Sequence, residues 1–558
     1  MLSSIIAHIP DWLVFFQAAI AFLLPVGANY LYNILNAWGN TGRFTAAAAG
    51  RNAAHKDKTA LSASQPSPSS ASGTPFSGNY AADLQAIRSA IGSNSDLHFR
   101  EFPLTKLHTK GTLIYVDGMQ NDRLLNLRIM EYLMFEATAD TLASPLNSVP
   151  AMPFSDLTAA ADLTAFNRSV LFGHAGLLID GMPHGLLIEL PGGANRSVTE
   201  PVSEALLRGP RLGFSEVLSE NTSMLRCQGF SDGLELKSYR IGNQMQKDLV
   251  IAYMKDIVNP ELLQEVETRI STIDSDFLAE SGYVEQLIED NWLSPFQQVQ
   301  NTERPDRVIS ALMEGRIAIL LNGTPFALIV PVTFSMLLQS PEDYYERWLP
   351  GSLLRMLRFA AAFLALMAPA LYISFISFHP GLIPTELAIS IIEARQGVPF
   401  PSIIEVLILE VSIEILREAG IRLPKPVGPA MGIVGGLIIG DAAVNAGIVS
   451  PFLVIVVAVT AISSFSIPMY SAGITLRLLR FAGMLFAAFL GMFGTILFFL
   501  LLCSHLTKLK SFGVPYLTPV SPFRLRDWKD LFFRAPLSLM KRRPAMLKTQ
   551  NDRRKSKV

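Results

Sequence analysis

The sequence contains few cysteines, few charged residues and no recognisable catalytic motif. Of its 558 residues two are cysteines, Cys227 in a polar region and Cys503 inside an apolar run, which excludes a disulfide framework or a cysteine-based metal site. Charged residues make up 17% of the chain, against about 25% in soluble domains, whereas 50% of the residues are hydrophobic. The eight histidines lack metal-ligand spacing, and no P-loop, H-E-x-x-H, C-x-x-C or G-x-S-x-G motif stands at a suitable place. We therefore expect a membrane protein with a soluble part, without an enzymatic active site and without a cofactor.

Positive charge is concentrated at the C-terminal end. From Lys508 onward the chain has fourteen basic and three acidic residues, a net charge of +11, so residues 1–507 carry −12. Residues 506–558 therefore form a basic tail, and because this tail directly follows an apolar run it should stay on the cytoplasmic side of a membrane. Its position beside the membrane argues against a nucleic-acid partner, which would otherwise suit such a composition.

The N-terminal part divides into an apolar and a polar segment. Residues 1–40 are largely apolar, and the first 42 residues contain no lysine or arginine. A cleaved secretory signal needs a basic start, so we expect an uncleaved segment that forms either an interfacial helix or a membrane span. Residues 41–80 are rich in Ala, Ser, Gly and Pro and cannot bury enough apolar surface to become ordered, which predicts a flexible linker.

Residues 81–350 have the pattern of a soluble α/β region, which we expect to form two subdomains. Thr112–Val116 is a short β-rich run, and the helical spacing of apolar residues predicts a helix over 121–135. In the stretch 316–330, Asn322-Gly323 separates two β-rich runs. This pair predicts a two-residue type I′ hairpin, because both turn positions need a positive φ, and it argues against a membrane span there.

Residues 351–505 contain the long apolar runs expected of an α-helical transmembrane domain. Three stretches of 27, 35 and 27 residues carry no formal charge, whereas about 20 apolar residues suffice to span a bilayer. We predict four spans, at about 355–379, 427–447, 450–470 and 481–503. Because this number is even, the α/β region and the basic tail lie on the same side of the membrane, the cytoplasm.

The segment 380–425 between the first two spans combines acidic residues with many Ile, Leu and Val and is interrupted by prolines. It suits an interfacial amphipathic helix, a re-entrant hairpin or broken helices facing water. A solvated helix face is the usual interpretation of its Glu410, Glu414 and Glu418, which lie four apart, but in a ring of subunits such acids would attract cations. Asp441, inside an apolar region, is either functional or salt-bridged near a span end. The candidate pore or gating residues are Glu386, Glu393, Glu405, Glu410, Glu414 and Asp441.

Four glycines recur at every fourth position of the second predicted span, namely Gly428, Gly432, Gly436 and Gly440. Such a strip of small residues favours close helix packing. The alternative is that this face meets another copy of the chain around a pore.

Several ordered motifs resemble those of one family, the A subunits of spore germination receptors, or GerA family. The resemblance covers about residues 100–545. It rests on Arg208-Gly209-Pro210-Arg211, Thr302-Glu303-Arg304-Pro305-Asp306, Glu314-Gly315-Arg316, Ser340-Pro341-Glu342-Asp343-Tyr344-Tyr345, Val398-Pro399-Phe400-Pro401, Glu414-Ile415-Leu416-Arg417-Glu418-Ala419-Gly420 and Phe512-Gly513-Val514-Pro515-Tyr516.

The resemblance implies an integral protein of the inner membrane of the endospore that couples nutrient sensing to release of monovalent cations. It also implies a transporter-like B subunit and a lipoprotein C subunit as partners, and a homo-oligomer that conducts ions. An accessory protein that assists dipicolinate release and a secondary transporter are the alternatives.

The two motifs around 208 and 304 have a structural and a functional interpretation. Gly209-Pro210 marks a turn across which Arg211 and Glu216 could pair, and the alternative is a subunit contact. The second motif suits a helix start with acids in its first turn. The residues singled out are Arg208, Arg211, Glu216, Glu303, Arg304 and Asp306.

Overall fold

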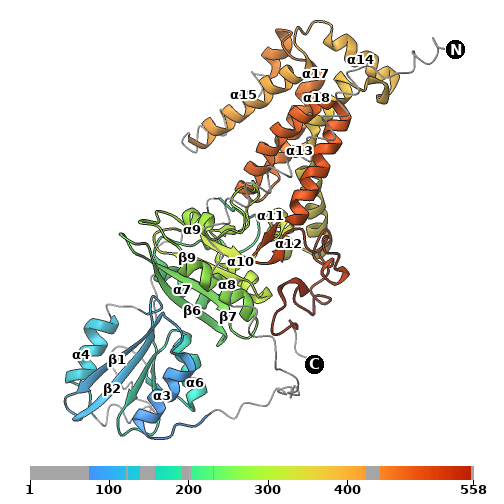
Figure 1. Cartoon of the computed structure of the whole chain (residues 1–558). Helices are drawn as coiled ribbons and strands as arrows, with labels where there is room; N and C mark the ends of the chain where they lie inside the picture. Colours follow the sequence, from blue (N-terminus) through green and yellow to red (C-terminus); the bar gives the residue numbers. More distant parts are fainter. Residues whose placement is uncertain are drawn as a thin grey trace, which may run out of the picture.

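The computed structural model describes residues 74–120, 124–138, 157–190, 200–201, 203–229, 231–422 and 440–554. Figure 1 shows a soluble region built on two sheets, a group of long helices beyond it, and a tail that returns to the soluble region. The predicted apolar segment 1–40, almost all of the linker 41–80, and Gly428, Gly432 and Gly436 lie outside the described residues.

The first subdomain is a five-stranded antiparallel sheet in the order β1-β2-β4-β5-β3. Helices α3 and α6 cover one face, and the π-helix η1 with α4 covers the other. The predicted strand at 112–116 and the predicted helix at 121–135 correspond to β2 and to η1 with α4. The elements are α3 Tyr80–Ile91, β1 Leu97–Leu104, β2 Thr109–Val116, η1 Leu124–Ile129, α4 Met130–Phe135, β3 Leu157–Ala159, α6 Leu163–Leu171, β4 Ala175–Ile179 and β5 Leu186–Ile188.

The second subdomain repeats this plan. Its antiparallel sheet has the order β6-β7-β9-β10-β8, which is the same permutation, and its elements follow one another in the same order along the chain. Helices α7 and α10 cover one face and α8 and α9 the other. The elements are α7 Leu218–Cys227, β6 Leu234–Ile241, β7 Lys247–Met254, α8 Pro260–Ser271, α9 Ser281–Ile288, β8 Gln300–Thr302, α10 Pro305–Glu314, β9 Ile317–Leu321 and β10 Ala327–Val330.

Strand β9 explains why the stretch near 320 is so apolar without crossing a membrane. All five of its side chains are buried, alternately against the α8/α9 layer and the α7/α10 layer. A strand covered on both faces reads as a continuous hydrophobic run. The soluble core thus accounts for this hydropathy peak.

The predicted hairpin at 316–330 is present, but the predicted turn is wrong. Strands β9 and β10 pair with Leu320 opposite Ala327, so the loop exceeds two residues. Gly323 has a φ of 87°, whereas Asn322 does not have a positive φ. Pro325 has no N–H to donate to the ladder, so β10 begins only at Ala327.

Two helical elements in the described part of the chain are long and apolar enough to cross a membrane, α13 Trp348–Ser377 and α18 Tyr470–Lys508. Within α18 the backbone of Gly491 is not helical (φ 59°, ψ −140°), so α18 consists of two helices joined by a kink at that residue. At 1.5 Å per residue the 30 residues of α13 extend about 45 Å, more than the roughly 30 Å of a hydrocarbon core. They overlap the first and contain the fourth of the predicted spans. The third falls on α17 Pro451–Phe465, which has only 15 residues, and most of the second lies outside the described residues. Two helices of spanning length are therefore found, and four spans stay a prediction.

Small residues bring α13 and α18 together. Ala362, Ala365 and Ala370 on α13 and Ala487 on α18 are buried. Small side chains let helix backbones approach closely, which is the usual way for helices to pack in a membrane. Of the four predicted helix-packing glycines, Gly440 lies in the described residues. A Cβ built on Gly440 would lie 3.6 Å from Val454 Cγ1, which is an ordinary van der Waals distance.

The segment 380–425 is helical where it is described. It forms the 3₁₀ turn η2 Pro380–Leu382, then α14 Thr385–Arg395 and α15 Ser402–Arg422. Pro399 and Pro401 lie between α14 and α15. In Figure 1 α15 projects away from α13 and α18.

The basic tail returns to the soluble region after α18. A small hairpin of β11 Lys510–Ser511 and β12 Val514–Pro515 begins it. Farther on, Arg543 Nε donates to the Met313 carbonyl at 2.7 Å and Gln550 Nε2 donates to the Val258 carbonyl at 2.9 Å. The tail and the soluble region therefore lie at the same end of the helices.

Candidate functional site

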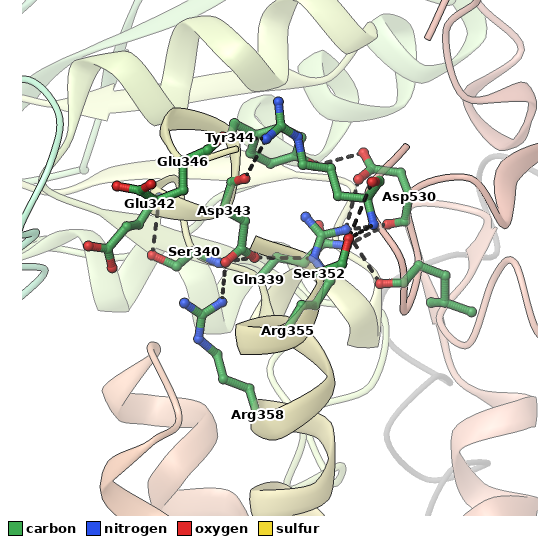
Figure 2. A network of polar contacts seen from close by, with 12 residues as sticks. Gln339, Ser340, Glu342, Asp343, Tyr344, Glu346, Ser352, Arg355, Arg358 and Asp530 are labelled. Carbon is green, nitrogen blue, oxygen red and sulfur yellow. Dashed lines mark hydrogen bonds and ion pairs between the residues drawn. The ribbon is translucent and has the colours of Figure 1, made fainter. Parts of the chain in front are cut away.

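A buried ion-pair cluster joins the soluble region to the start of α13. The four-residue helix α12 Glu342–Tyr345 directly precedes α13 and carries Asp343, while Arg355 and Arg358 lie three residues apart on one face of α13. Arg355 Nε donates to Asp343 Oδ2 at 3.1 Å and Arg358 Nη1 donates to Asp343 Oδ1 at 2.5 Å. The side chains of Asp343 and Arg355 are both 0% exposed. Figure 2 shows Asp343 between the two arginines.

The tail supplies the second acid of this cluster. Asp530 approaches Arg355 from the side opposite Asp343 (Figure 2), with Arg355 Nη1 donating to Asp530 Oδ1 at 2.8 Å and to its carbonyl at 2.9 Å. The Tyr344 hydroxyl donates to Asp530 Oδ2 at 2.7 Å. Burial raises the pKa of Asp530, while Arg355 opposes the rise. The tail is thus held to α13 by a carboxylate that depends on one arginine.

The tail also caps carbonyl groups at this point. Arg534 Nη1 donates to the carbonyls of Asp343 and Glu346 at 2.9 and 2.8 Å. The Arg534 backbone N–H donates to Ser352 Oγ on α13 at 3.0 Å. We call the contacts among α12, the first turns of α13 and residues 530–534 the junction.

The two motifs predicted around 208 and 304 meet beside the junction. Arg304, 1% exposed, donates from Nη2 to the Pro210 carbonyl at 2.6 Å and to Asp306 Oδ2 at 3.1 Å. The Tyr345 hydroxyl donates to the same Asp306 oxygen. A continuous chain of polar contacts therefore runs from the loop at 210 through α10 to α12.

The remaining motif residues have other partners. Arg208 pairs with Glu346 at 3.5 Å, and Ser203 Oγ donates to Glu303 Oε1 at 2.8 Å. The predicted pair of Arg211 with Glu216 is wrong, because Arg211 pairs with Glu200 at 3.2 Å. Glu216 is exposed and contributes its backbone carbonyl to Gly323 N–H at 2.8 Å.

The sequence patterns did not reveal the junction. The structure buries Arg355 and pairs both Arg355 and Arg358 with Asp343. One pattern could have revealed this, namely an acid in a short helix followed 12 and 15 residues later by arginines in an otherwise apolar helix. The contribution of Asp530 comes from a distant part of the chain and has no local pattern.

The members of the junction depend on one another because they are buried and charged. Removing one member of a buried ion pair leaves an unpaired charge at a cost of about 3–5 kcal/mol. The contacts are consequently expected to form and break together. A displacement of the soluble region would be passed to α13 and to the tail.

A second set of ion pairs contains three of the predicted pore candidates. Arg395 Nη2 donates to Glu405 Oε1 at 2.6 Å, and Arg480 pairs with Glu410 at 2.9 Å, with both of those side chains 1% exposed. Glu414 pairs with Arg477 of α18 at 3.1 Å. The predicted acidic face of α15 is thus partly covered by arginines, five of which lie on α14, α15 and α18: Arg395, Arg417, Arg422, Arg477 and Arg480.

The other three candidates lie elsewhere. Glu386 and Glu393 are exposed on α14, and Asp441 is exposed near the end of the segment that precedes α17. The structure therefore groups Glu405, Glu410 and Glu414 with cations and leaves these three at the surface. Whether any of the six lines a pore stays a prediction.

In the described residues no group of three or more His, Cys, Asp or Glu side chains is placed to hold a metal ion. The organisation is that of a two-subdomain α/β region attached to apolar helices.

Comparisons with known proteins identify the family. The family model of the Bacillus/Clostridium GerA spore germination protein matches residues 85–546. The chain is 42% identical over 478 residues to spore germination protein GerLA of Bacillus cereus, covering 85% of this chain and 97% of that one. It is 44% identical over 385 residues to spore germination protein A1 of Bacillus subtilis (strain 168), covering 69% and 79%.

An uncharacterized membrane protein, YfkQ of Bacillus subtilis (strain 168), is 40% identical over 493 residues, covering 87% of this chain and 94% of that one. Among solved structures, the N-terminal domain of the A subunit of the Bacillus megaterium spore germinant receptor GerK3 is 29% identical, covers 47% of this chain and 99% of that one, and superposes with a TM-score of 0.37. The chain belongs to the GerA family of spore germination proteins.

Proposed function

We propose that this chain is the A subunit of a spore nutrient germinant receptor in the inner membrane of the endospore. The observation that carries the proposal is the family match over residues 85–546, which includes both α/β subdomains, the apolar helices and most of the tail. Its partners would be a transporter-like B subunit, which takes up the nutrient, and a lipoprotein C subunit.

In this proposal α13 and α18 cross the bilayer. Large apolar side chains are exposed along them, including Leu353, Leu357, Leu485, Phe489 and Leu500, and lipid would cover these. Because the tail contacts the soluble region, the number of crossings between them is even. The excess of basic residues in the tail places both parts in the cytoplasm.

Several copies would assemble into a cation-conducting pore with α15 at the subunit interface. Ile404, Ile408, Val411 and Ile415 form an exposed apolar stripe on this projecting helix, and a neighbouring copy would cover it. Within one chain the nearby acids are neutralised by arginines. Opening would exchange these arginines for water and passing cations.

The junction would carry the signal. Partner binding can shift a closed state toward an open one only through a difference in affinity for the two states. A partner that contacts the α/β region could supply this difference, and the junction would transmit it to α13.

Release of potassium ions from spores tests the proposal. Deletion of this chain should abolish release on exposure to particular nutrients and leave other stimuli effective. A uniform slowing for all stimuli would instead favour an accessory role in dipicolinate release, the first alternative.

Vesicles containing the purified chain separate the remaining classes. A secondary transporter would move a substrate stoichiometrically with the chain alone. A scaffold would give no ion current with or without the partner subunits, and this outcome would refute the pore.

A further inference from the structure

A basic cavity lies between the soluble region and the tail. It has a volume of about 280 Å³ and is bordered by the end of α10, by the short helix α11 Phe334–Leu338 and by residues of the tail. Seven cationic side chains line it against three acidic ones, an excess of four positive charges. Arg316 comes from the soluble region, and the tail contributes Arg526, Lys529, Lys541, Arg542, Arg543 and Arg554.

Two of the three acids of the cavity wall, Glu314 and Asp530, are held in ion pairs. Glu314 pairs with Arg554 at 2.7 Å, and Asp527 accepts the Ala545 N–H at 3.0 Å. Asp530 belongs to the junction, where it pairs with Arg355. Asp527 Oδ2 has no hydrogen-bond partner in the described residues, and Asp552, outside the wall, pairs with Arg526 at 3.2 Å. Even with these two acids counted, cationic side chains remain in excess around the cavity.

Arg316 is the buried cation of this cavity. It is 1% exposed, and its Nη1 donates to the Pro331 carbonyl. Its Nε has no hydrogen-bond partner in the described part of the chain. It lies 3.5 Å from Glu314 Oε2, and the other oxygen of that carboxylate, Oε1, pairs with Arg554 at 2.7 Å. A buried donor without a partner is costly, so a ligand that accepts from Arg316 would be bound favourably.

Two lysines complete the site at its exposed side. Lys529 and Lys541 line the cavity, and neither makes a side-chain ion pair within residues 440–554 or the other described ranges. Both lysines can therefore bind a ligand without breaking an existing ion pair.

The chemistry fits a phosphate group. Guanidinium and ammonium groups are the usual phosphate ligands, and a phosphate ester carries about −1.5 to −2 charges at pH 7. The volume, just below the roughly 300–1,000 Å³ of drug-sized sites, suits a small molecule or a headgroup. We propose that this cavity binds the phosphate group of a small phosphorylated molecule or of a lipid headgroup, with Arg316 at its base and Lys529 and Lys541 at its rim.

Binding would have a structural consequence that does not depend on the receptor assignment. The ligand would contact both the soluble region and the tail, next to Asp530 of the junction. It would therefore hold the tail in place.

Titration calorimetry on the detergent-solubilised full chain, with inorganic pyrophosphate as probe, tests this site. The Lys529→Gln/Lys541→Gln double variant should weaken binding at least tenfold, and so should Arg316→Gln. The matched control, Lys510→Gln/Lys548→Gln, removes two exposed tail lysines that do not line the cavity and should change binding less than twofold. Equal weakening by both lysine pairs would show unspecific attraction to the tail, and the absence of binding at millimolar pyrophosphate would refute the site.

A second arm distinguishes the two sources of phosphate. In nanodiscs of phosphatidylglycerol a headgroup in the cavity should compete with pyrophosphate, and in nanodiscs of phosphatidylcholine it should not. Equal pyrophosphate binding in both identifies a free phosphorylated molecule. If Arg316→Gln does not fold, the lysine variant and its control still decide the matter.

Discussion

Replacing Arg355 by methionine should release the tail from the helices. Arg355 is the cation shared by Asp343 and Asp530, and the substitution keeps a side chain of similar length without the charge. Asp343 would keep Arg358, and among the described residues Asp530 would keep only the Tyr344 hydroxyl as a side-chain donor.

The free-energy cost of Arg355→Met follows from the burial of the ion pair. Removing one partner of a buried ion pair costs about 3–5 kcal/mol. Asp530 is 23% exposed, so solvent relieves part of the penalty and we expect the lower end, about 3 kcal/mol. At about 1.4 kcal/mol per factor of ten, the population of open tail should rise roughly 100-fold.

Hydrogen–deuterium exchange of the detergent-solubilised full chain measures this population. Peptides covering residues 528–540 should exchange roughly 100-fold faster, whereas peptides covering the buried strand β9 should not change. The control Arg347→Met removes an exposed arginine at the start of α13 and should cost less than about 0.5 kcal/mol.

A double-variant cycle isolates the pair itself. Asp530→Asn removes the charge that Arg355 compensates, so the double variant should lose less stability than the two single variants together. If the losses of stability in the two single variants simply add, or if residues 528–540 exchange in Arg355→Met as slowly as in the wild type, the junction does not hold the tail in place.

The remaining predictions concern pH, a helix kink and ion flux. Burial raises the pKa of Glu285 to about 8 and of Glu289 to about 7, so between about pH 5 and 8 the folded chain holds protons that an unfolded chain has released. The free energy of unfolding should therefore fall as the pH rises through this window, and Glu285→Gln should flatten the fall in a thermal-unfolding series. Gly491→Ala should destabilise α18 by about 1–3 kcal/mol, because Gly491 has a φ of 59° and a Cβ there would lie 2.7 Å from the ring of Phe378. In the control Gly473→Ala the new Cβ would meet no atom within 4 Å, so this change should not destabilise the helix. Glu410→Gln should reduce potassium release from spores at least tenfold at unchanged protein level, and normal release would remove this residue from the pore proposal.

Local patterns predicted much of the soluble fold. The strands at 112–116 and 316–330 and the helix at 121–135 follow from periodicity and turn residues, which act over a few neighbours. The repeat of the same fold in the two subdomains was not predicted from the sequence, because the subdomains share an order of elements rather than a visible sequence pattern. The turn at Asn322-Gly323 was mispredicted because Pro325 delays the next strand.

The helical region was predictable only in outline. Hydropathy located α13 and α18, since long apolar runs determine them. It could not show that the acids of α15 meet arginines of α18, or that Asp530 reaches Arg355, because these contacts join residues 70 and 175 positions apart and depend on packing. The sequence therefore identified the motifs that contribute to the candidate site, but it did not predict which of their side chains contact one another.

Potassium release from spores, followed during exposure to single nutrients, tests the central claim most directly. A strain that lacks this chain should fail to release potassium for at least one nutrient, a plasmid copy should restore the response, and a copy carrying Arg355→Met should not. Unchanged release for every nutrient, or the same partial slowing for all of them, would contradict a receptor subunit that couples nutrient sensing to ion flux.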